Sequence, residues 1–227
     1  MNEPQPLTDK ELERAIGTYS KRLLRTYDTF VLGFSNSWAW RCPREVMLGQ
    51  YDRCLRARHL DVGPGTGWYL ANAQLPEGAD ITLLDLSSNS LASASSRLAG
   101  VTHRSVLANV LEPLPDGLGR FDSIAVNYVF HCIPGPWADK GQAFLHLADG
   151  LADDGVLFGS TILGAGIHHN LVGRFFMAFY NKKGIFHNRE DDEAGLTAAL
   201  QAGFDEVEVT VVGTVAMFTA RGPRRCG

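Results

Sequence analysis

The stretch "HLDVGPGTGWYL", residues 59–70, decides how the rest of the chain is interpreted. It places three glycines within five positions, Gly63, Gly65 and Gly67, and Asp61 comes just before them. Glycine loses more conformational freedom on folding than any other residue. A cluster this dense therefore indicates a backbone that turns tightly and comes close to another group.

Around this stretch, strand-like and helix-like segments alternate. Strands are predicted over 58–62, 80–86, 102–108, 121–127 and 155–163, and helices over 67–75, 88–98, 139–151 and 190–202. This alternation predicts a parallel sheet covered by helices on both faces. The last two β-rich runs, 204–212 and 214–221, are separated by Gly213 alone. So short a link has no room for a crossover helix and predicts an antiparallel pair.

Two segments lie outside this alternation. Apolar residues at steps of three or four predict a long amphipathic helix over 8–32, and a second helix runs from Pro43 to Cys54. Residues 164–188 form an insertion rich in histidine and aromatic residues. We therefore expect a helical lid over residues 1–55 and an α/β domain over 56–227, whose insertion contributes to a cap over the substrate.

The composition is that of an ordinary globular protein. The chain has 227 residues, of which 45% are hydrophobic and 20% charged, and a formal net charge of −4. This charge predicts no general attraction to nucleic acids or to anionic membranes. The four cysteines form no Cys-x-x-Cys pair, which argues against a disulfide framework and a zinc site. The polar N-terminus and the lack of an apolar run of about 18 residues predict a cytoplasmic protein. The oligomeric state is not predicted.

The glycine stretch distinguishes between classes of ligand. A dinucleotide-binding loop has the pattern Gly-x-Gly-x-x-Gly/Ala, whereas this chain has Gly-x-Gly-x-Gly followed by Trp68. A phosphate-binding P-loop needs Gly-Lys-Ser/Thr, which is absent from this stretch. The pattern therefore indicates a ligand other than a dinucleotide or a nucleoside triphosphate.

The segment "LDVGPGTG" resembles motif I of the class I S-adenosylmethionine-dependent methyltransferases, and the resemblance extends over residues 56–221. It implies a Rossmann-like α/β fold with a seven-stranded, mostly parallel sheet of order 3-2-1-4-5-7-6 and an antiparallel last strand. It also implies S-adenosylmethionine as the cofactor and S-adenosylhomocysteine as the product; the lack of clustered acidic ligands around the strand over 121–127 predicts no metal. Within this resemblance, Gly63, Gly65 and Gly67 pass beneath the cofactor, and Asp61 lies near its cationic end.

Asp85 closes the strand predicted over 80–86, eighteen residues after Gly67. The resemblance implies that its carboxylate accepts hydrogen bonds from both ribose hydroxyls, because a carboxylate is an acceptor with two oxygens. Leu86 is then expected to lie against the adenine. Alternatively, Asp85 caps the next helix, although Ser87 is also suited to that role.

Further cofactor contacts follow from the same resemblance. Asn109, followed by Val110, stands where the family commonly has an acid that binds the adenine amino group. Asn109 is equally suited to forming a turn. Asn127, at the end of the strand over 121–127, is expected to face the methionine part of the cofactor. Tyr27 either reaches the cofactor carboxylate from the lid or packs within its helix.

The acceptor side is expected near the end of the same strand. His131 lies four residues past Asn127 and is our candidate for a general base. Structural packing is the alternative. Trp38 and Trp40 form either an apolar pocket wall or an anchor for the lid. His168 and Phe175, on the insertion, are further candidates for substrate contacts.

The function implied by the resemblance is in-line transfer of a methyl group to a small-molecule acceptor, through O, N, S or C. The alternatives are a protein side-chain methyltransferase and a non-catalytic S-adenosylmethionine-binding partner subunit. DNA amino-methylases carry two prolines after the asparagine of this strand, whereas here Asn127 is followed by Tyr128, Val129 and Phe130. Asn127 and His131 do not supply the acidic cluster of the metal-dependent catechol type.

Overall fold

The computed structural model of the protein describes residues 36–225. Residues 1–35 and 226–227 are not described, so the helix predicted over 8–32 and the cofactor contact predicted for Tyr27 lie outside the described residues. The lid boundary predicted at residue 55 stays a prediction.

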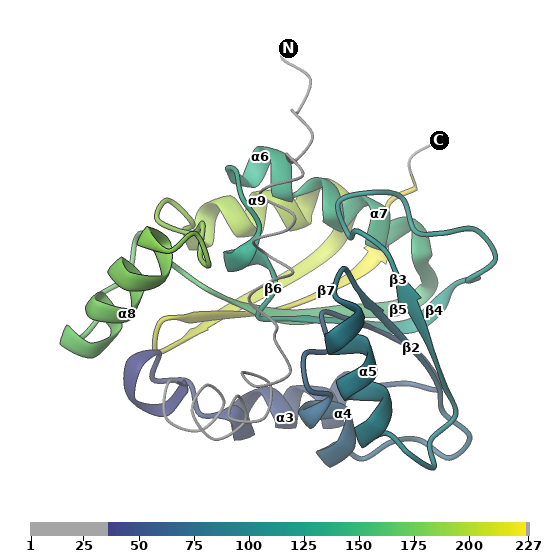
Figure 1. Cartoon of the computed structure of the whole chain (residues 1–227). Coiled ribbons are helices and arrows are strands. Elements are labelled where there is room, and N and C mark those ends of the chain that lie inside the picture. The colour runs from purple at the N-terminus through teal and green to yellow at the C-terminus, as the bar shows by residue number, and fades with distance from the viewer. Residues whose placement is uncertain (1–35, 226–227) are drawn as a thin grey trace.

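A seven-stranded sheet of order β3-β2-β1-β4-β5-β7-β6 forms the centre of the molecule (Figure 1). Its strands are β1 (Arg58–Val62), β2 (Asp80–Asp85), β3 (His103–Leu107), β4 (Phe121–Asn127), β5 (Leu151–Ile162), β6 (Phe204–Val212) and β7 (Val215–Pro223). The pairs among the first five strands are parallel, and β7 runs antiparallel to both β5 and β6. The predicted order, direction and closing hairpin are therefore confirmed.

Helices cover both faces of this sheet. They are α3 (Arg44–Cys54), α4 (Trp68–Asn72), α5 (Ser88–Arg97), the 3-10 turn η2 (Phe130–Cys132), α6 (Trp137–Lys140), α7 (Gln142–Gly150), α8 (Leu171–Lys182) and α9 (Glu193–Gly203). In Figure 1, α3, α4 and α5 lie below the sheet, and α6, α7 and α9 lie above it. One hydrophobic core fills each side, because side chains alternate between the two faces of every strand. Among the described helices, none has both the length and the apolar character needed to cross a membrane.

Three predicted boundaries were wrong. The helix expected over 139–151 is two helices, α6 and α7, with a break at Gly141, where a Cβ would lie 2.6 Å from the Trp137 carbonyl oxygen. β5 begins at Leu151, opposite Phe121 of β4, earlier than the predicted residue 155. α9 begins after Asp192, whose side chain caps it by accepting from Gly195 N.

The insertion also contains an unpredicted helix. α8 begins after Asn170, whose side chain accepts a hydrogen bond from Gly173 N at 2.7 Å. The helix projects from the side of the molecule, beside the carboxyl ends of the strands (Figure 1). The three elements that matter for the site, the glycine turn, the end of β4 and the insertion, thus meet at one edge of the sheet.

Candidate functional site

The glycine turn joins β1 to α4 in a conformation that other residues rarely adopt. Gly63, Gly65 and Gly67 have φ values of 67°, 56° and 73°. A Cβ on Gly67 would lie 2.9 Å from the Ala94 Cα, so the turn packs closely against α5. A Cβ on Gly65 would meet nothing within 4 Å. The backbone at Gly65 therefore faces open space, which lets a ligand approach it closely.

A pocket opens above this turn, at the carboxyl ends of β1 and β4. It is lined by residues 63–66, Tyr51, Trp68, Tyr69, Asn127 and Tyr128. In parallel α/β sheets, ligands bind outside the carboxyl ends of the strands where the strand order reverses. The order reverses here between β1 and β4, because β1 has β2 on its other side. The pocket therefore lies where a cofactor is expected.

Asp61 does not line this pocket but is hydrogen-bonded to Tyr51, which does. Its side chain is buried, with 2% exposure, and its Oδ2 accepts a hydrogen bond from Tyr51 Oη at 2.8 Å. Burial, with the Asp61 charge, holds the pKa of Tyr51 well above its usual range, so the phenol remains a donor. Tyr51 stacks on Tyr69 at 5.3 Å between ring centroids. The sequence did not single out Tyr51, because its helix gives no motif of its own.

Asp85 ends β2 and does not cap the following helix. Ser87 is the residue whose side chain accepts from Ser90 N, while Asp85 Oδ1 accepts from Ser87 N at 2.7 Å. Burial raises the pKa of Asp85 to about 6, and the charge of Asp61 adds to this effect. Hydrogen-bond donors from a ligand would stabilise the ionised carboxylate. This is the chemistry expected of a residue that binds two hydroxyls.

Asn127 holds a buried donor without a well-formed hydrogen bond. Its Oδ1 accepts from Ser160 Oγ at 2.7 Å, whereas its Nδ2 makes no hydrogen bond of good geometry among the described residues, although the Asn127 side chain interacts with Tyr51. The side chain lines the pocket and is 7% exposed. A buried donor left without a partner costs free energy, so this atom favours a ligand that supplies an acceptor. The open backbone at Gly65 and the Asn127 donor together fit the amino-acid end of S-adenosylmethionine.

The residues predicted around the adenine are close to the core. Asn109 Oδ1 accepts from Leu111 N at 3.1 Å, the turn-forming arrangement that the sequence also allowed. Val110 is 7% exposed and belongs to one hydrophobic core, and Leu86 is half-buried. Their contacts with adenine stay predictions.

His131 lies beneath the insertion, in η2. It is 4% exposed, and its ring packs on Phe186 at 4.4 Å and on Tyr128 at 5.6 Å between centroids. Burial and the nearby Lys140 charge lower the pKa of His131 to about 3, so the imidazole is neutral at physiological pH. Tyr128 has a φ of 57°, which is strained for a residue other than glycine. Such strain gathers at functional sites, and the sequence offered no sign of it.

The four predicted substrate contacts other than His131 separate into two groups. Trp38 is 65% exposed, Phe175 of α8 is also 65% exposed, and His168 is exposed, with its carbonyl oxygen accepting from Arg41 Nη2. Trp40 is instead a core residue with 2% exposure, and its role in a pocket wall stays a prediction. Its ring packs against Phe186 of the insertion at 5.9 Å between centroids.

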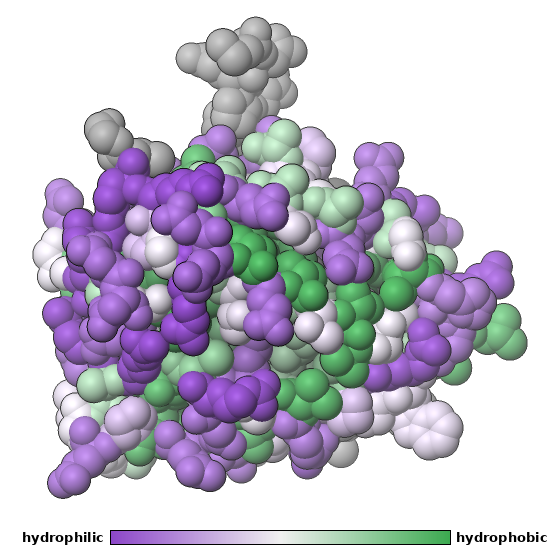
Figure 2. Space-filling model, turned by 180° about the vertical axis from the view of Figure 1, so that it is seen from behind, coloured by the Kyte–Doolittle hydropathy of each residue, from purple (hydrophilic) through white to green (hydrophobic). Residues whose placement is uncertain are grey.

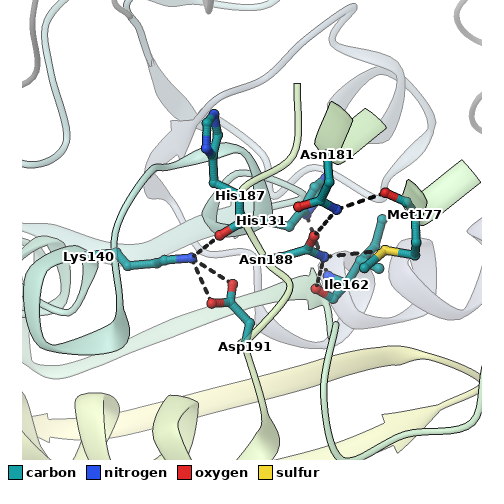
Figure 3. A network of polar contacts seen from close by, with 8 residues as sticks. All are labelled: His131, Lys140, Ile162, Met177, Asn181, His187, Asn188 and Asp191. Atoms are coloured by element: carbon teal, nitrogen blue, oxygen red, sulfur yellow. Dashed lines mark hydrogen bonds and ion pairs between the residues drawn. The ribbon is translucent and has the colours of Figure 1, made fainter. Parts of the chain in front are cut away.

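A polar network that sequence reasoning missed lies directly behind His131 (Figure 3). Lys140 has no exposed surface, and its Nζ donates to both carboxylate oxygens of Asp191 at 2.8 and 2.7 Å. The same Nζ donates to the His187 carbonyl oxygen at 3.2 Å, and His187 N donates to the His131 carbonyl oxygen at 2.8 Å. The side chain of Asn188, fully buried, donates to the Ile162 carbonyl oxygen at 2.8 Å. These contacts join the end of the insertion to α6, η2 and β5.

Within residues 36–225, no group of three or more His, Cys, Asp or Glu side chains has the arrangement needed to hold a metal ion. The expectation that the protein works without a metal stays a prediction.

Comparison with known proteins defines the class. A family model described as "Methyltransferase domain" matches residues 60–157, which span the glycine turn, Asp85 and Asn127. A complex described as "DhpI-SAH complex structure" superposes with a TM-score of 0.68 at 15% identity, covering 96% of this chain and 100% of that chain. The N-methyltransferase NodS from Bradyrhizobium japonicum, solved with S-adenosyl-L-homocysteine, has a TM-score of 0.63 at 12% identity over 93% of this chain and 100% of its own. At these identities the structures show a shared fold, that of a Rossmann-like methyltransferase.

Curated relatives narrow the class to a family. The "Physcion biosynthesis cluster O-methyltransferase" of Aspergillus chevalieri is 40% identical over 93% of this chain and 96% of its own length. The "Demethylluteothin O-methyltransferase" of Streptomyces thioluteus is 39% identical over 94% of each chain. The chain therefore belongs to the S-adenosylmethionine-dependent methyltransferases of class I. It is an enzyme that transfers a methyl group from S-adenosylmethionine to a small-molecule acceptor.

Proposed function

We propose that the acceptor atom is a hydroxyl oxygen of a small molecule, and that the protein is an O-methyltransferase. Several relatives that align with most of this chain are named for this reaction, in biosynthesis of physcion and with demethylluteothin as acceptor. A relative named as an N-methyltransferase, from Penicillium aethiopicum, is 37% identical over 82% of this chain. Because the names of the relatives include both reactions, the proposal that oxygen is the acceptor also rests on a feature of the site, the buried neutral imidazole of His131.

Our proposal assigns the cofactor to the pocket above the glycine turn. The observation that carries it is the Asn127 donor without a well-formed hydrogen bond in a pocket that the open backbone of Gly65 also lines. Asn127 and Tyr51 would hold the amino-acid end, and Asp85 would accept the ribose hydroxyls. Bound S-adenosylmethionine supplies an activated methyl group on its sulfonium. The residues of the chain then have to orient the acceptor, exclude water and accept a proton.

In this proposal His131 accepts the hydroxyl proton. Its Nδ1 accepts a marginal hydrogen bond from Ile162 N at 3.5 Å. Nε2 can accept the hydroxyl proton only in the tautomer that carries the ring hydrogen on Nδ1, so the proposed step requires this marginal contact to be given up. Burial and Lys140 keep the ring neutral, so one of its nitrogens carries no proton at any physiological pH. A pKa near 3 makes His131 a weak base, which favours an acidic hydroxyl such as a phenol over an aliphatic alcohol.

The experiment is a turnover assay with S-adenosylmethionine carrying a deuterated methyl group. Purified protein is offered matched pairs of aromatic acceptors that differ only in carrying a hydroxyl, an amine or a thiol. Mass spectrometry of the product and release of S-adenosylhomocysteine are measured together. Labelled methyl ether formed from the phenols supports the proposal, and transfer to the amines alone contradicts it. S-adenosylhomocysteine binding without turnover on any acceptor favours a non-catalytic partner subunit.

The expectations of a cytoplasmic location, of no nucleic-acid or membrane partner, and of no bound metal remain part of this proposal. They are supported by the net charge of −4 and the unclustered cysteines.

A further inference from the structure

The side chain of Tyr51 lies between the cofactor pocket and a buried carboxylate. Tyr51 lines the pocket, and its Oη donates a hydrogen bond to Asp61 Oδ2 at 2.8 Å. A hydroxyl has one proton to donate and two lone pairs with which to accept. Since Asp61 takes the proton of Tyr51, the remaining capacity of this hydroxyl is that of an acceptor.

The interaction of Tyr51 with Asn127 agrees with this polarity. Asn127 also lines the pocket, and its Oδ1 accepts from Ser160 Oγ at 2.7 Å, so its amide nitrogen is the atom left for Tyr51. Burial and the Asp61 charge hold the pKa of Tyr51 well above its usual range, and Asn127 acts in the opposite sense, as a donor to Oη does. Oη therefore already attracts a donor, and its second lone pair is available to a ligand.

Asp61 is the charge behind this acceptor. The residues that line the pocket, 63–66 with Tyr51, Trp68, Tyr69, Asn127 and Tyr128, include no charged side chain. Asp61 is 2% exposed, and within residues 36–225 the one basic side chain at ion-pair distance is His59, whose Nε2 lies 3.9 Å from Oδ2. A histidine is charged only when it is protonated. A cationic group of a ligand would therefore compensate this carboxylate more completely.

The polar groups of the pocket are enclosed, unlike the apolar side chains of α8. Leu171 and Phe175 are 81% and 65% exposed, and apolar surface reaches the edge of the molecule where α8 projects (Figure 2). Tyr51, by contrast, is 1% exposed. Hydrogen bonds and charges interact more strongly in such an enclosed setting than in water. The Asp61 charge should consequently influence a ligand that contacts Tyr51.

Packing fixes the position of the Tyr51 hydroxyl. The ring stacks on Tyr69 at 5.3 Å between centroids with an interplanar angle of 7°, and Phe158 meets it edge-on at 5.2 Å. The preceding residue, Gln50, donates to the Phe218 carbonyl oxygen at 2.8 Å and so holds α3 to the sheet. A polar atom that is fixed before binding loses little entropy when the ligand arrives.

We propose that Tyr51 Oη accepts a hydrogen bond from the ammonium group of S-adenosylmethionine, and that Asp61 is a positioning residue that acts through Tyr51. This inference rests on the proposed function, which assigns the cofactor to this pocket. An ammonium group carries three donors and a positive charge, and both match an acceptor that is hydrogen-bonded to a carboxylate. The Asn127 donor then suits the carboxylate of the cofactor. The two side chains together select one orientation of the amino-acid end.

The test compares two ligands that differ only in the amine. S-adenosylhomocysteine and S-adenosyl-4-thiobutyrate, in which hydrogen replaces the amino group, are titrated into the full chain and followed by calorimetry. Their affinity ratio is the amine preference. Wild-type protein should prefer the amine about tenfold or more, the effect of a hydrogen bond to a charged group. Tyr51→Phe should lose this preference, because it weakens binding of S-adenosylhomocysteine and leaves that of the analogue nearly unchanged.

A second substitution tests the role of Asp61. Asp61→Asn removes the charge but keeps an oxygen that can accept from Tyr51, and it should lower the amine preference by itself. In a Tyr51→Phe background the same substitution should have little further effect, because the two residues act along one path. Equal reductions in both backgrounds would show that Asp61 acts independently of Tyr51, which overturns its role as a positioning residue.

Tyr69→Phe is the matched control. Tyr69 lines the same pocket, but its hydroxyl lies 3.5 Å from Met47 Sδ instead of a carboxylate. This variant should keep the amine preference of the wild type, and loss of the preference here would contradict a specific role for Tyr51. Circular dichroism checks that each variant is folded.

An amine preference retained in Tyr51→Phe overturns the proposal, and if that variant does not fold, a preference retained in Asp61→Asn overturns it. The proposal also fails if the wild type binds both ligands equally, a result that leaves the proposed function intact. Absence of S-adenosylhomocysteine binding would instead contradict the proposed function.

Discussion

Buried polar groups occur in two regions of the molecule: the cofactor edge, at the carboxyl ends of β1, β2 and β4, and the polar network beneath the insertion. The groups of the two regions differ in whether they have hydrogen-bond partners. At the cofactor edge, Asn127 Nδ2 makes no hydrogen bond of good geometry in the part of the chain that the structure describes, and burial raises the pKa of Asp85 to about 6. Under the insertion, Lys140 and Asp191 form a bidentate ion pair, and Asn188 donates to the Ile162 carbonyl oxygen. The first group is incompletely satisfied without a ligand. Lys140, Asp191 and Asn188 are satisfied within the fold, although Trp137 Nε1 and His169 Nδ1 in the same region have no partner among the described residues.

This difference separates binding groups from positioning groups. Unpaired buried polar atoms cost stability, so a protein retains them where a ligand supplies the missing partner. Paired buried charges resist removal of one partner, so they hold neighbouring elements in one arrangement. His131 lies between the two regions: its carbonyl oxygen belongs to the satisfied network, and its ring faces Tyr128 of the pocket. Four substitutions or conditions test this division.

The largest effect, on turnover, is expected for substitution of His131, which lies between the two regions. His131→Ala should slow turnover roughly 10²–10⁴-fold if the imidazole accepts the proton, and leave affinity for S-adenosylhomocysteine unchanged. Steady-state kinetics and calorimetry on the same preparation measure the two quantities. His131→Gln fills more of the same space and controls for the cavity. A wild-type rate in either variant would assign His131 a structural role only.

Breaking the ion pair should affect folding rather than cofactor binding. Lys140→Met leaves the Asp191 carboxylate buried without its cation, which should lower the free energy of unfolding by about 3–5 kcal/mol. Urea denaturation followed by circular dichroism measures this change. The double variant Lys140→Met/Asp191→Leu removes both charges and should recover most of the stability. A single variant as stable as the wild type would refute the view that this region is held by the pair.

Unlike Lys140→Met, the variant Asp85→Asn should affect chiefly cofactor binding rather than folding. Loss of the charged acceptor should weaken S-adenosylhomocysteine binding by on the order of 1–3 kcal/mol in calorimetry. The cofactor-free protein should become somewhat more stable, because the buried carboxylate is itself costly there. Asp80→Asn, at the other end of the same strand, is the control and should bind normally. Unchanged affinity in the Asp85 variant would contradict its role at the ribose.

The smallest effect is a pH dependence. Because the pKa of Asp85 is raised to about 6, the cofactor-free fold retains this proton more strongly than the unfolded chain does. Its contribution to stability is therefore present at low pH and is lost as the pH rises through about 6. Affinity for S-adenosylhomocysteine should change in the opposite sense, falling up to about tenfold per pH unit below this value. Calorimetry between pH 5 and 8 tests this, and Asp85→Asn should abolish the dependence.

Much of the cofactor edge was predictable because its determinants are local. Gly63, Gly65 and Gly67 adopt positive φ values in a single turn, and Asp85 is the last residue of a strand that the sequence predicts. The antiparallel hairpin follows from the short link at Gly213. The helix at 139–151 was predicted as continuous, whereas the structure has two helices separated at Gly141, where an added Cβ would lie 3.1 Å from the Ala199 Cβ of α9; no local pattern reveals that contact.

The amino-acid sequence alone determined the alternating elements and the class of cofactor, since each depends on residues close together in the chain; the order of the sheet came from the family resemblance. Tertiary structure decided which groups meet across long separations: Lys140 with Asp191, His131 with Phe186, and Gln50 with the carbonyl oxygen of Phe218. It also placed Trp40 in the core and left Phe175 exposed, although both are aromatic residues in irregular-looking segments. The physical reason is that burial and pairing depend on what the fold brings alongside a side chain, which its neighbours in sequence do not specify.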